Sequence, residues 1–189
     1  MSDSKVWLDS CIETATRYRR MIDAAVRQLS DEAFFARPKK HVHSVAVLVR
    51  HLGGNLQSRW TNFLTEDGEK PNRNRDQEFE DWPDDRDALM AYFDAGWQCL
   101  TDTLDSLSAD ELTRTVTIRG EPLAVPQAIL RSLTHTSYHV GQLLLVARLM
   151  HDDDGSWEWL TIPPGGSEAH DAAKWGTSSS RGVAGKRES

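Results

Sequence analysis

Cysteine, long apolar runs and positive charge are all scarce in this sequence. Among 189 residues only Cys11 and Cys99 are cysteines, and both lie on apolar faces of expected helices, which favours core thiols over a disulfide. No stretch approaches the roughly 20 apolar residues that span a bilayer. The first ten residues lack the basic start and apolar core of a signal peptide. We therefore expect a cytoplasmic protein without a membrane partner.

The charge balance excludes a further class of partner. Asp and Glu number 29 against 22 Lys and Arg, so the net charge is -7. Binding to the phosphate backbone of nucleic acid needs clustered Lys and Arg, and an anionic membrane surface makes the same demand. We therefore expect neither nucleic acid nor membrane as a partner. A small-molecule substrate remains the expected ligand class.

Hydrophobic periodicity predicts an all-α fold. Apolar residues recur at steps of three and four in four segments, which indicates long helices over residues 6–29, 44–64, 83–107 and 126–150. Four long helices joined in pairs predict a four-helix bundle. Two connections differ in character: residues 65–82 read as a long loop, and residues 113–125 as a small β-hairpin before the last helix.

The C-terminal segment differs in composition from the rest of the chain. Residues 169–189 are rich in small and polar side chains and lack helical periodicity, which is typical of a flexible tail. We therefore predict one helical bundle domain over residues 1–168, followed by a flexible tail over residues 169–189. A chain of this length has room for one domain with a real core.

Two histidines in the last helix have the spacing of a metal site. His135 and His139 are four residues apart, so they stack on one side of a helix and their imidazoles can converge on one ion. The same line of the helix carries Ser132 and Gln142. Chance also produces such pairs, and hydrogen-bonded core or surface histidines are the alternative. No Glu follows His135, so the zinc-protease helix motif is absent.

A tight site needs a third ligand from elsewhere in the chain. We predict His51, because it lies inside the second helix, where a rigid backbone holds it in fixed geometry. Its position is about 120° from the centre of the apolar stripe, so it is not simply a core residue. The other candidates lie in loops, at a helix end or in the tail: His41, His43, His151 and His170.

Several motifs, taken in order, resemble one protein family. Residues Leu133–Leu143, which read LTHTSYHVGQL, and residues Arg50–Trp60, which read RHLGGNLQSRW, are similar to motifs of the DinB-like (damage-inducible) superfamily of small bacterial metal-binding proteins. Three further segments resemble an uncharacterised branch of that superfamily: residues 67–76, 117–121 and 160–165. The resemblance extends over about residues 1–168.

The resemblance implies a fold, a metal and a partner. Such proteins are four-helix bundles, commonly homodimers, and hold zinc or nickel on one histidine from the second helix and two from the fourth. Carried over to this chain, the ligands are His51, His135 and His139. Some relatives are S-transferases or isomerases that use low-molecular-weight thiols. Imidazole ligands suit several metals, so the sequence leaves the metal's identity open.

Three histidines define what such a site is able to do. Three neutral imidazoles leave a divalent ion its full charge and at least one open position, which is the pattern of catalytic sites. We therefore predict a metal-dependent enzyme, for example a hydrolase or, as the resemblance implies, a thiol-dependent S-transferase acting on small electrophiles. The alternatives are a non-catalytic metal- or ligand-binding stress-response protein and a purely structural bundle. No catalytic side chain is identifiable, because no Ser or Cys nucleophile accompanies a base.

Five residues near the predicted site each have two interpretations. Asn55 and Gln142 either orient the ligands or are ordinary helix-surface amides. Arg73 and Arg75 either bind an anionic substrate group or hold a charged loop on the bundle through ion pairs with Asp76, Glu78 or Glu80. Trp60 is either a core residue or a pocket wall.

Overall fold

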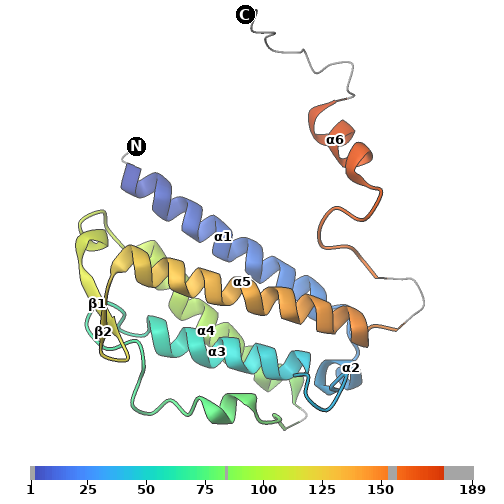
Figure 1. Cartoon of the computed structure of the whole chain (residues 1–189), viewed down its shortest axis with the longest axis horizontal. Coiled ribbons are helices and arrows are strands. Elements are labelled where there is room, and N and C mark those ends of the chain that lie inside the picture. The colour runs from blue at the N-terminus through green and yellow to red at the C-terminus, as the bar shows by residue number, and fades with distance from the viewer. Residues whose placement is uncertain (1–2, 84, 153–156, 177–189) are drawn as a thin grey trace, which may run out of the picture. The chain divides into compact units, whose positions relative to one another are not determined.

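Four long helices form the first of two compact units in the chain. The computed structural model describes residues 3–83, 85–152 and 157–176, and the chain divides into residues 1–156 and 157–189. The predicted helical bundle is confirmed (Figure 1), and its long helices are α1 (Asp3–Val26), α3 (Val45–Trp60), α4 (Arg86–Ser106) and α5 (Val125–Met150).

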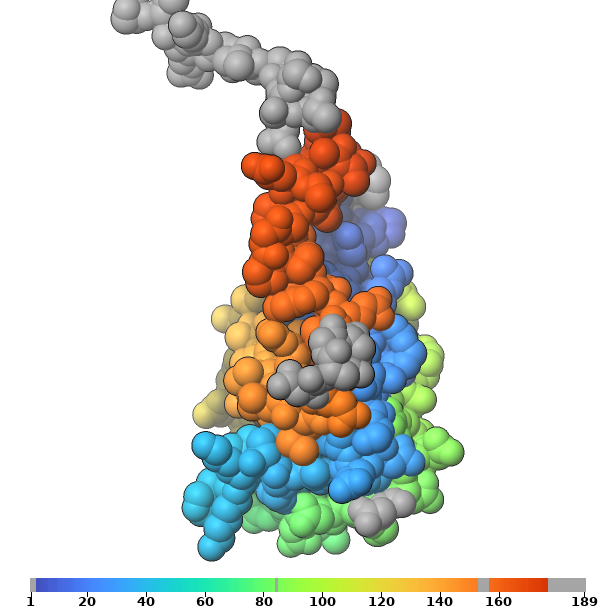
Figure 2. Space-filling model, turned by 90° about the vertical axis from the view of Figure 1, so that its right-hand side faces the viewer, coloured from blue at the N-terminus to red at the C-terminus, as the bar shows by residue number. Residues whose placement is uncertain are grey.

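The bundle is built from two closely packed helix pairs. Helix α3 packs mainly against α4, and α1 mainly against α5, while α3–α5 and α1–α4 contacts close the bundle. Figure 2 shows α1 in blue directly against α5 in orange. The two cysteines are free thiols, as predicted, with Cys11 buried and Cys99 half-buried. No helix within the described residues is long and apolar enough to cross a bilayer.

Two glycines allow α3 and α4 to approach each other closely. A Cβ atom placed on Gly96 of α4 would clash with the backbone carbonyl of Gly53 in α3. Any larger side chain at residue 96 would therefore push the two helices apart. Since α3 carries His51, this close contact between α3 and α4 fixes the position of His51 in the bundle.

Side-chain caps set the beginnings of three helices. The hydroxyl of Ser30 accepts a hydrogen bond from the Ala33 amide and starts the short helix α2 (Asp31–Phe35). Ser44 caps α3 in the same way, as predicted. Helix α4 begins at Arg86, three residues later than predicted, because the Asp85 carboxylate caps it. Asp84, part of that prediction, lies outside the described residues.

Two helices end earlier than their apolar periodicity predicted. Helix α1 stops at Val26, because the amides of Gln28 and Leu29 bond to carbonyls three residues back instead of four. Helix α3 stops at Trp60, because Thr61 is extended, with a ψ of 124°, and Asn62 follows with a φ of 50°. Leu29 and Phe63, which lie just after the ends of these helices, are nevertheless buried. The apolar periodicity therefore predicted the burial of these residues correctly, although it placed the helix ends too late.

The predicted hairpin is present and is tied to the loop before α4. Strands β1 (Thr115–Ile118) and β2 (Glu121–Ala124) pair antiparallel, with Ile118 opposite Glu121. The turn residues Arg119 and Gly120 have φ values of 56° and 75°, and the Asp67 carboxylate accepts hydrogen bonds from both of their amides at 2.8 and 2.7 Å. Asp67 thereby holds Arg119 in a conformation that non-glycine residues rarely adopt.

The connections and the second unit add short helical segments. The loop of residues 65–82 contains one 3-10 turn, η1 (Asp76–Phe79), and another, η2 (Glu111–Thr113), precedes β1. In the second unit, residues predicted as tail include most of helix α6 (Ser167–Trp175). Residues 177–189 of the predicted tail lie outside the described residues.

Candidate metal centre

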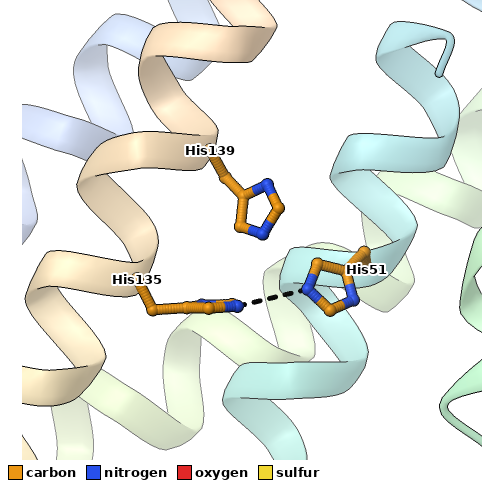
Figure 3. A group of neighbouring side chains, drawn as sticks. All are labelled: His51, His135 and His139. Atoms are coloured by element: carbon orange, nitrogen blue, oxygen red, sulfur yellow. Dashed lines mark hydrogen bonds between the residues drawn. The ribbon is translucent and has the colours of Figure 1, made fainter. Parts of the chain in front are cut away.

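Helices α3 and α5 bring three histidines together, as Figure 3 shows. His135 and His139 project from the same side of α5, one turn apart, with ring centroids 4.7 Å from each other. His51 projects from α3 toward both, at centroid distances of 5.2 and 4.7 Å. His51 and His139 are buried and His135 is half-buried.

The spacing of the ring nitrogens suits a shared ion. One nitrogen from each histidine lies within 4.8 Å of the other two. The Nε2 atoms of His51 and His135 are 3.2 Å apart. Two imidazoles at about 2.05 Å from one tetrahedral ion have their nitrogens about 3.3 Å apart. The three residues therefore fit a divalent cation, and within the described residues no other group of His, Cys, Asp or Glu has this arrangement.

His139 has one ring nitrogen that lacks a partner. Its Nδ1 donates a hydrogen bond to the side-chain oxygen of Gln142 at 2.8 Å, so in the neutral ring the lone pair is on Nε2. That Nε2 is buried and has no hydrogen-bond partner among the described residues. An unsatisfied buried acceptor is costly. Its position beside the other two rings is explained if it is a metal ligand.

A buried carboxylate sets the orientation of His51. The His51 Nδ1 donates to Glu78 Oε2 at 2.8 Å, which leaves its Nε2 facing the other histidines. Arg73 donates to both oxygens of the same carboxylate, at 2.7 and 2.8 Å. A histidine that donates to a carboxylate while its other nitrogen faces an ion is the usual arrangement of metal-binding histidines.

The surroundings of His135, His139 and Glu78 favour neutral imidazoles and an ionised carboxylate, which are the protonation states suited to a cation. Burial lowers the pKa of His135 to about 3, with the charges of His139 and His51 adding to the effect. Burial and His51 lower the pKa of His139 to about 4. Burial alone would raise the pKa of Glu78, but hydrogen bonds from His51 and Arg73 outweigh it and keep that pKa below its usual value. Both α5 imidazoles are therefore neutral at pH 7, and the carboxylate is ionised.

Two aromatic rings cover the sides of the cluster. Phe79 of η1 stacks on the His51 ring at a centroid distance of 4.4 Å. Tyr138 lies beside His139 at 4.2 Å and beside His135 at 5.2 Å. These contacts restrict the rotation of the imidazoles and exclude water from part of the site.

A pocket of about 180 Å³ opens onto two of the three histidines. Its wall combines residues of α3, the loop of residues 65–82, the hairpin and α5, and it includes His51 and His135. Five of its lining residues are arginines: Arg59, Arg73, Arg75, Arg119 and Arg131. The centre is therefore accessible to a ligand from one side.

The model of one protein family matches residues 2–166 of the chain. The chain belongs to the DUF1572 family. That family is described as proteins of unknown function. Comparison with curated proteins and with solved structures gave no significant match. The site of this DUF1572 member is therefore interpreted from its own geometry.

The DUF1572 chain assembles the three predicted histidines and leaves out the four other candidates. His41 is exposed, His151 follows α5, and His170 lies in α6 of the second unit. The ring of His43 lies 5.3 Å from that of Phe79, which in turn stacks on His51. None of these four belongs to the cluster.

The structure assigns contacts to most of the residues that had two interpretations. Gln142 contacts a predicted ligand, and Asn55 lines the pocket. Trp60 is both buried and part of the pocket wall, and its Nε1 donates to Ser132 at 3.1 Å. Arg73 forms the expected ion pair with Glu78, whereas Arg75 comes no nearer to Asp76 than 3.9 Å.

Sequence reasoning did not single out Glu78 as a ligand-orienting residue, and it missed three of the pocket arginines. Arg131 is one helical turn before His135, a spacing that points to the same face of α5. Arg59 lies two turns after His51 on α3, within a motif already recognised. Glu78 and Arg119 come from a loop and a turn, where spacing along the chain does not predict position in space.

Proposed function

We propose that this protein is an enzyme that holds one divalent metal ion on His51, His135 and His139 and uses that ion in its reaction. The observation that carries the proposal is the buried, unpartnered Nε2 of His139 beside two further imidazoles from separate helices. Neutral imidazoles are the protonation state that metal binding requires, and burial gives both α5 histidines that state at pH 7.

An open site supports catalysis more than a structural role. Structural zinc sites have four protein ligands, whereas catalytic sites have three and keep a position for water or substrate. Within the described residues, the cluster has three members and adjoins a pocket. A divalent cation held there supplies Lewis acidity, which lowers the pKa of a water or thiol that reaches it.

The residues around the histidines keep the site in one geometry. Glu78 holds the His51 ring so that Nε2 faces inward, and Arg73 holds the Glu78 carboxylate. Gln142 does the same for His139. Phe79 and Tyr138 limit the movement of the rings. Such support keeps a catalytic arrangement ready before the substrate enters.

Thiol S-transfer to a small electrophile is the reaction that we propose. The thiol loses its proton to solvent, its sulfur forms a bond to the electrophilic carbon, and the leaving group departs with its electron pair. The resemblance of residues 133–143 to the DinB-like superfamily supports this choice, because some of its members are thiol-dependent. Zinc and nickel are the metals that the same resemblance supports, with a low-molecular-weight thiol as co-substrate.

A homodimer is part of the proposal. Helix α5 exposes three leucines to a large degree, namely Leu130, Leu145 and Leu149. Exposed apolar side chains that gather on one helix favour association. Sedimentation velocity of the full chain tests this, and a monomer at micromolar concentration would contradict it.

The test combines metal analysis with an activity screen. Protein purified without a histidine tag is subjected to elemental analysis, and we expect about one zinc or nickel per chain. The metal-loaded protein is then screened with thiols and small electrophiles against a His135→Ala variant. Equal rates for the two proteins would refute the transferase and favour a non-catalytic metal- or ligand-binding protein. Metal-free protein whose melting is unchanged by added zinc or nickel would refute the metal site itself.

A further inference from the structure

The arginines of the pocket form two groups that differ in exposure and pairing. Arg73 and Arg59 are the inner pair, with side chains only 5% and 12% exposed. Arg73 is bound by Glu78 and Glu69, and Arg59 by Glu69 at 2.8 Å. These two arginines are neutralised within the protein, and they hold the loop on the bundle.

The outer three arginines are half-exposed and incompletely paired. Arg75 and Arg131 reach a carboxylate only at 3.9 and 4.0 Å, to Asp76 and Glu121, which are themselves largely exposed. Arg119 shares Glu69 with the inner pair, at 3.1 Å through its Nε. Within the part of the chain that the structure describes, the ion pairs of these three arginines leave most of their guanidinium N–H groups available to a ligand.

The charge at the pocket is opposite to that of the whole chain. Five arginines line the pocket, and no described Asp or Glu does. Two carboxylates, those of Glu69 and Glu78, neutralise the inner arginines. The other three arginines have weaker neutralisation, because Arg119 only shares Glu69 and the carboxylates nearest to Arg75 and Arg131 are exposed and 3.9 and 4.0 Å away, in a chain whose net charge is -7. Such a local concentration of one sign attracts a ligand of the other sign.

The backbone places two of these arginines with some precision. Arg119 is held at a φ of 56° by the Asp67 carboxylate, which binds its amide. Hydrogen bonds from three amides outweigh the effect of burial and lower the pKa of Asp67 to about 2, so this support is ionised at neutral pH. Arg131 lies four residues before His135 on α5, about 6 Å along the helix axis. A group bound by Arg131 is therefore close to the histidine cluster.

We infer that Arg75, Arg119 and Arg131 bind the anionic group of a small substrate whose reacting part lies at the histidine cluster, an assignment that rests on the proposed metal enzyme. The anion is an oxyanion, carried as a carboxylate or a phosphate, because the guanidinium fork matches both. The pocket of about 180 Å³ admits a compact molecule, whereas drug-sized ligands occupy about 300–1,000 Å³.

Isothermal titration of the full, metal-loaded chain tests this assignment. Succinate and inorganic phosphate are the two probes, titrated at low ionic strength because half-exposed charges are screened by salt. We expect at least one of them to bind. Glutamine substitutions at Arg75, Arg119 and Arg131, made singly, each weaken binding about tenfold, since a hydrogen bond to a charged group is lost. Arg20→Gln removes the same charge from an exposed site of α1 and changes affinity less than twofold.

The outcomes separate the oxyanion subsite from the metal site. Binding of succinate alone identifies a carboxylate, and binding of phosphate alone identifies a phosphate. Failure of both probes, or equal affinities for Arg131→Gln and Arg20→Gln, overturns the subsite. So does a probe that loses all affinity in His135→Ala while the three arginine variants bind it normally, because then only the ion holds it. Elemental analysis of the same samples reports separately whether the proposed metal is present.

Discussion

The two sides of the histidine cluster are built from different kinds of chain. On one side, helices α3 and α5 supply all three imidazoles. On the other side, the loop of residues 65–82 supplies Glu78, Arg73 and Phe79, which touch His51 or the residues that hold it. The helices provide the imidazoles, and the loop provides charge and orientation.

In the proposed metal site, this division separates the residues that would coordinate the ion from the residues that would orient them. A rigid helix fixes the distance between two side chains one turn apart, so the α5 pair needs little help to converge. The single histidine of α3 has no such neighbour, and a buried carboxylate from the loop sets its ring. The contributions of the two sides are measurable on one scale, the affinity for the metal.

The largest effect is expected from removal of a helix-borne ligand. In His139→Ala the cluster loses its unpartnered Nε2, so metal affinity falls by more than the roughly 10- to 100-fold that loss of an orienting contact costs. Competition with a chelator measures this. His41→Ala, at an exposed site outside the cluster, is the control and retains full affinity. Equal affinities for the two variants would show that the histidines do not share an ion.

The next largest effect is expected on the loop side. Glu78→Gln keeps the shape of the side chain but removes its charge, so metal affinity falls about 10- to 100-fold. Arg73 also loses its buried partner, and the free energy of unfolding falls by about 3 kcal/mol. Denaturant unfolding and chelator competition measure the two effects. Glu80→Gln, an exposed site two residues away, is the control.

These two measurements together decide what the loop does. If Glu78→Gln lowers the free energy of unfolding and leaves metal affinity intact, the loop only docks on the bundle. The proposal that the loop orients the histidine ligands is then wrong. If affinity also falls, the orientation of His51 depends on a residue 27 positions away in the sequence.

The same contrast explains what the sequence predicted and what it did not. The i,i+4 spacing of His135 and His139 and the interior position of His51 predicted the cluster together with the resemblance to the DinB-like superfamily, and helix geometry is what converts such spacing into direction. The bundle and the hairpin followed from periodicity and turn residues. Helix ends were less accurate: α3 ends where Thr61 is extended and Asn62 takes a φ of 50°, and the apolar pattern does not encode these backbone angles.

In a loop, the spacing of residues along the sequence does not predict the direction in which their side chains point. Nothing in the pattern around Glu78 distinguishes it from Glu80, yet one is buried against His51 and the other is exposed. Arg75 and Arg73 were given the same two interpretations, and the structure separates them by their partners, since Arg73 is paired at 2.7 Å and Arg75 only at 3.9 Å. Tertiary contacts decide these cases.

A smaller effect is expected where helix and loop meet. A Cβ atom on Gly54 of α3 would lie 2.5 Å from Glu78 Oε1 and 2.7 Å from the Tyr92 hydroxyl. Gly54→Ala therefore displaces the carboxylate, and we expect metal affinity to fall by up to about tenfold, the lower limit for loss of an orienting contact. It also lowers stability, although alanine is the better helix former.

Gly141→Ala is the matched control for that variant. Gly141 is also helical, but a Cβ there meets nothing within 4 Å, so the substitution stabilises the protein by about 0.5–1 kcal/mol and leaves metal affinity unchanged. Thermal or denaturant unfolding shows the opposite signs. A stabilising Gly54→Ala would mean that Glu78 has room to move away without loss.

The smallest effect is expected from the one orienting contact that lies within a helix. Gln142→Ala removes the acceptor of the His139 Nδ1 hydrogen bond. A neutral hydrogen bond contributes about 0.5–1.5 kcal/mol, and Gln142 is exposed, so water can take its place. Metal affinity should fall about two- to fivefold by chelator competition. A loss as large as that of Glu78→Gln would mean that orientation, and not the loop's buried charge, is what both contacts contribute.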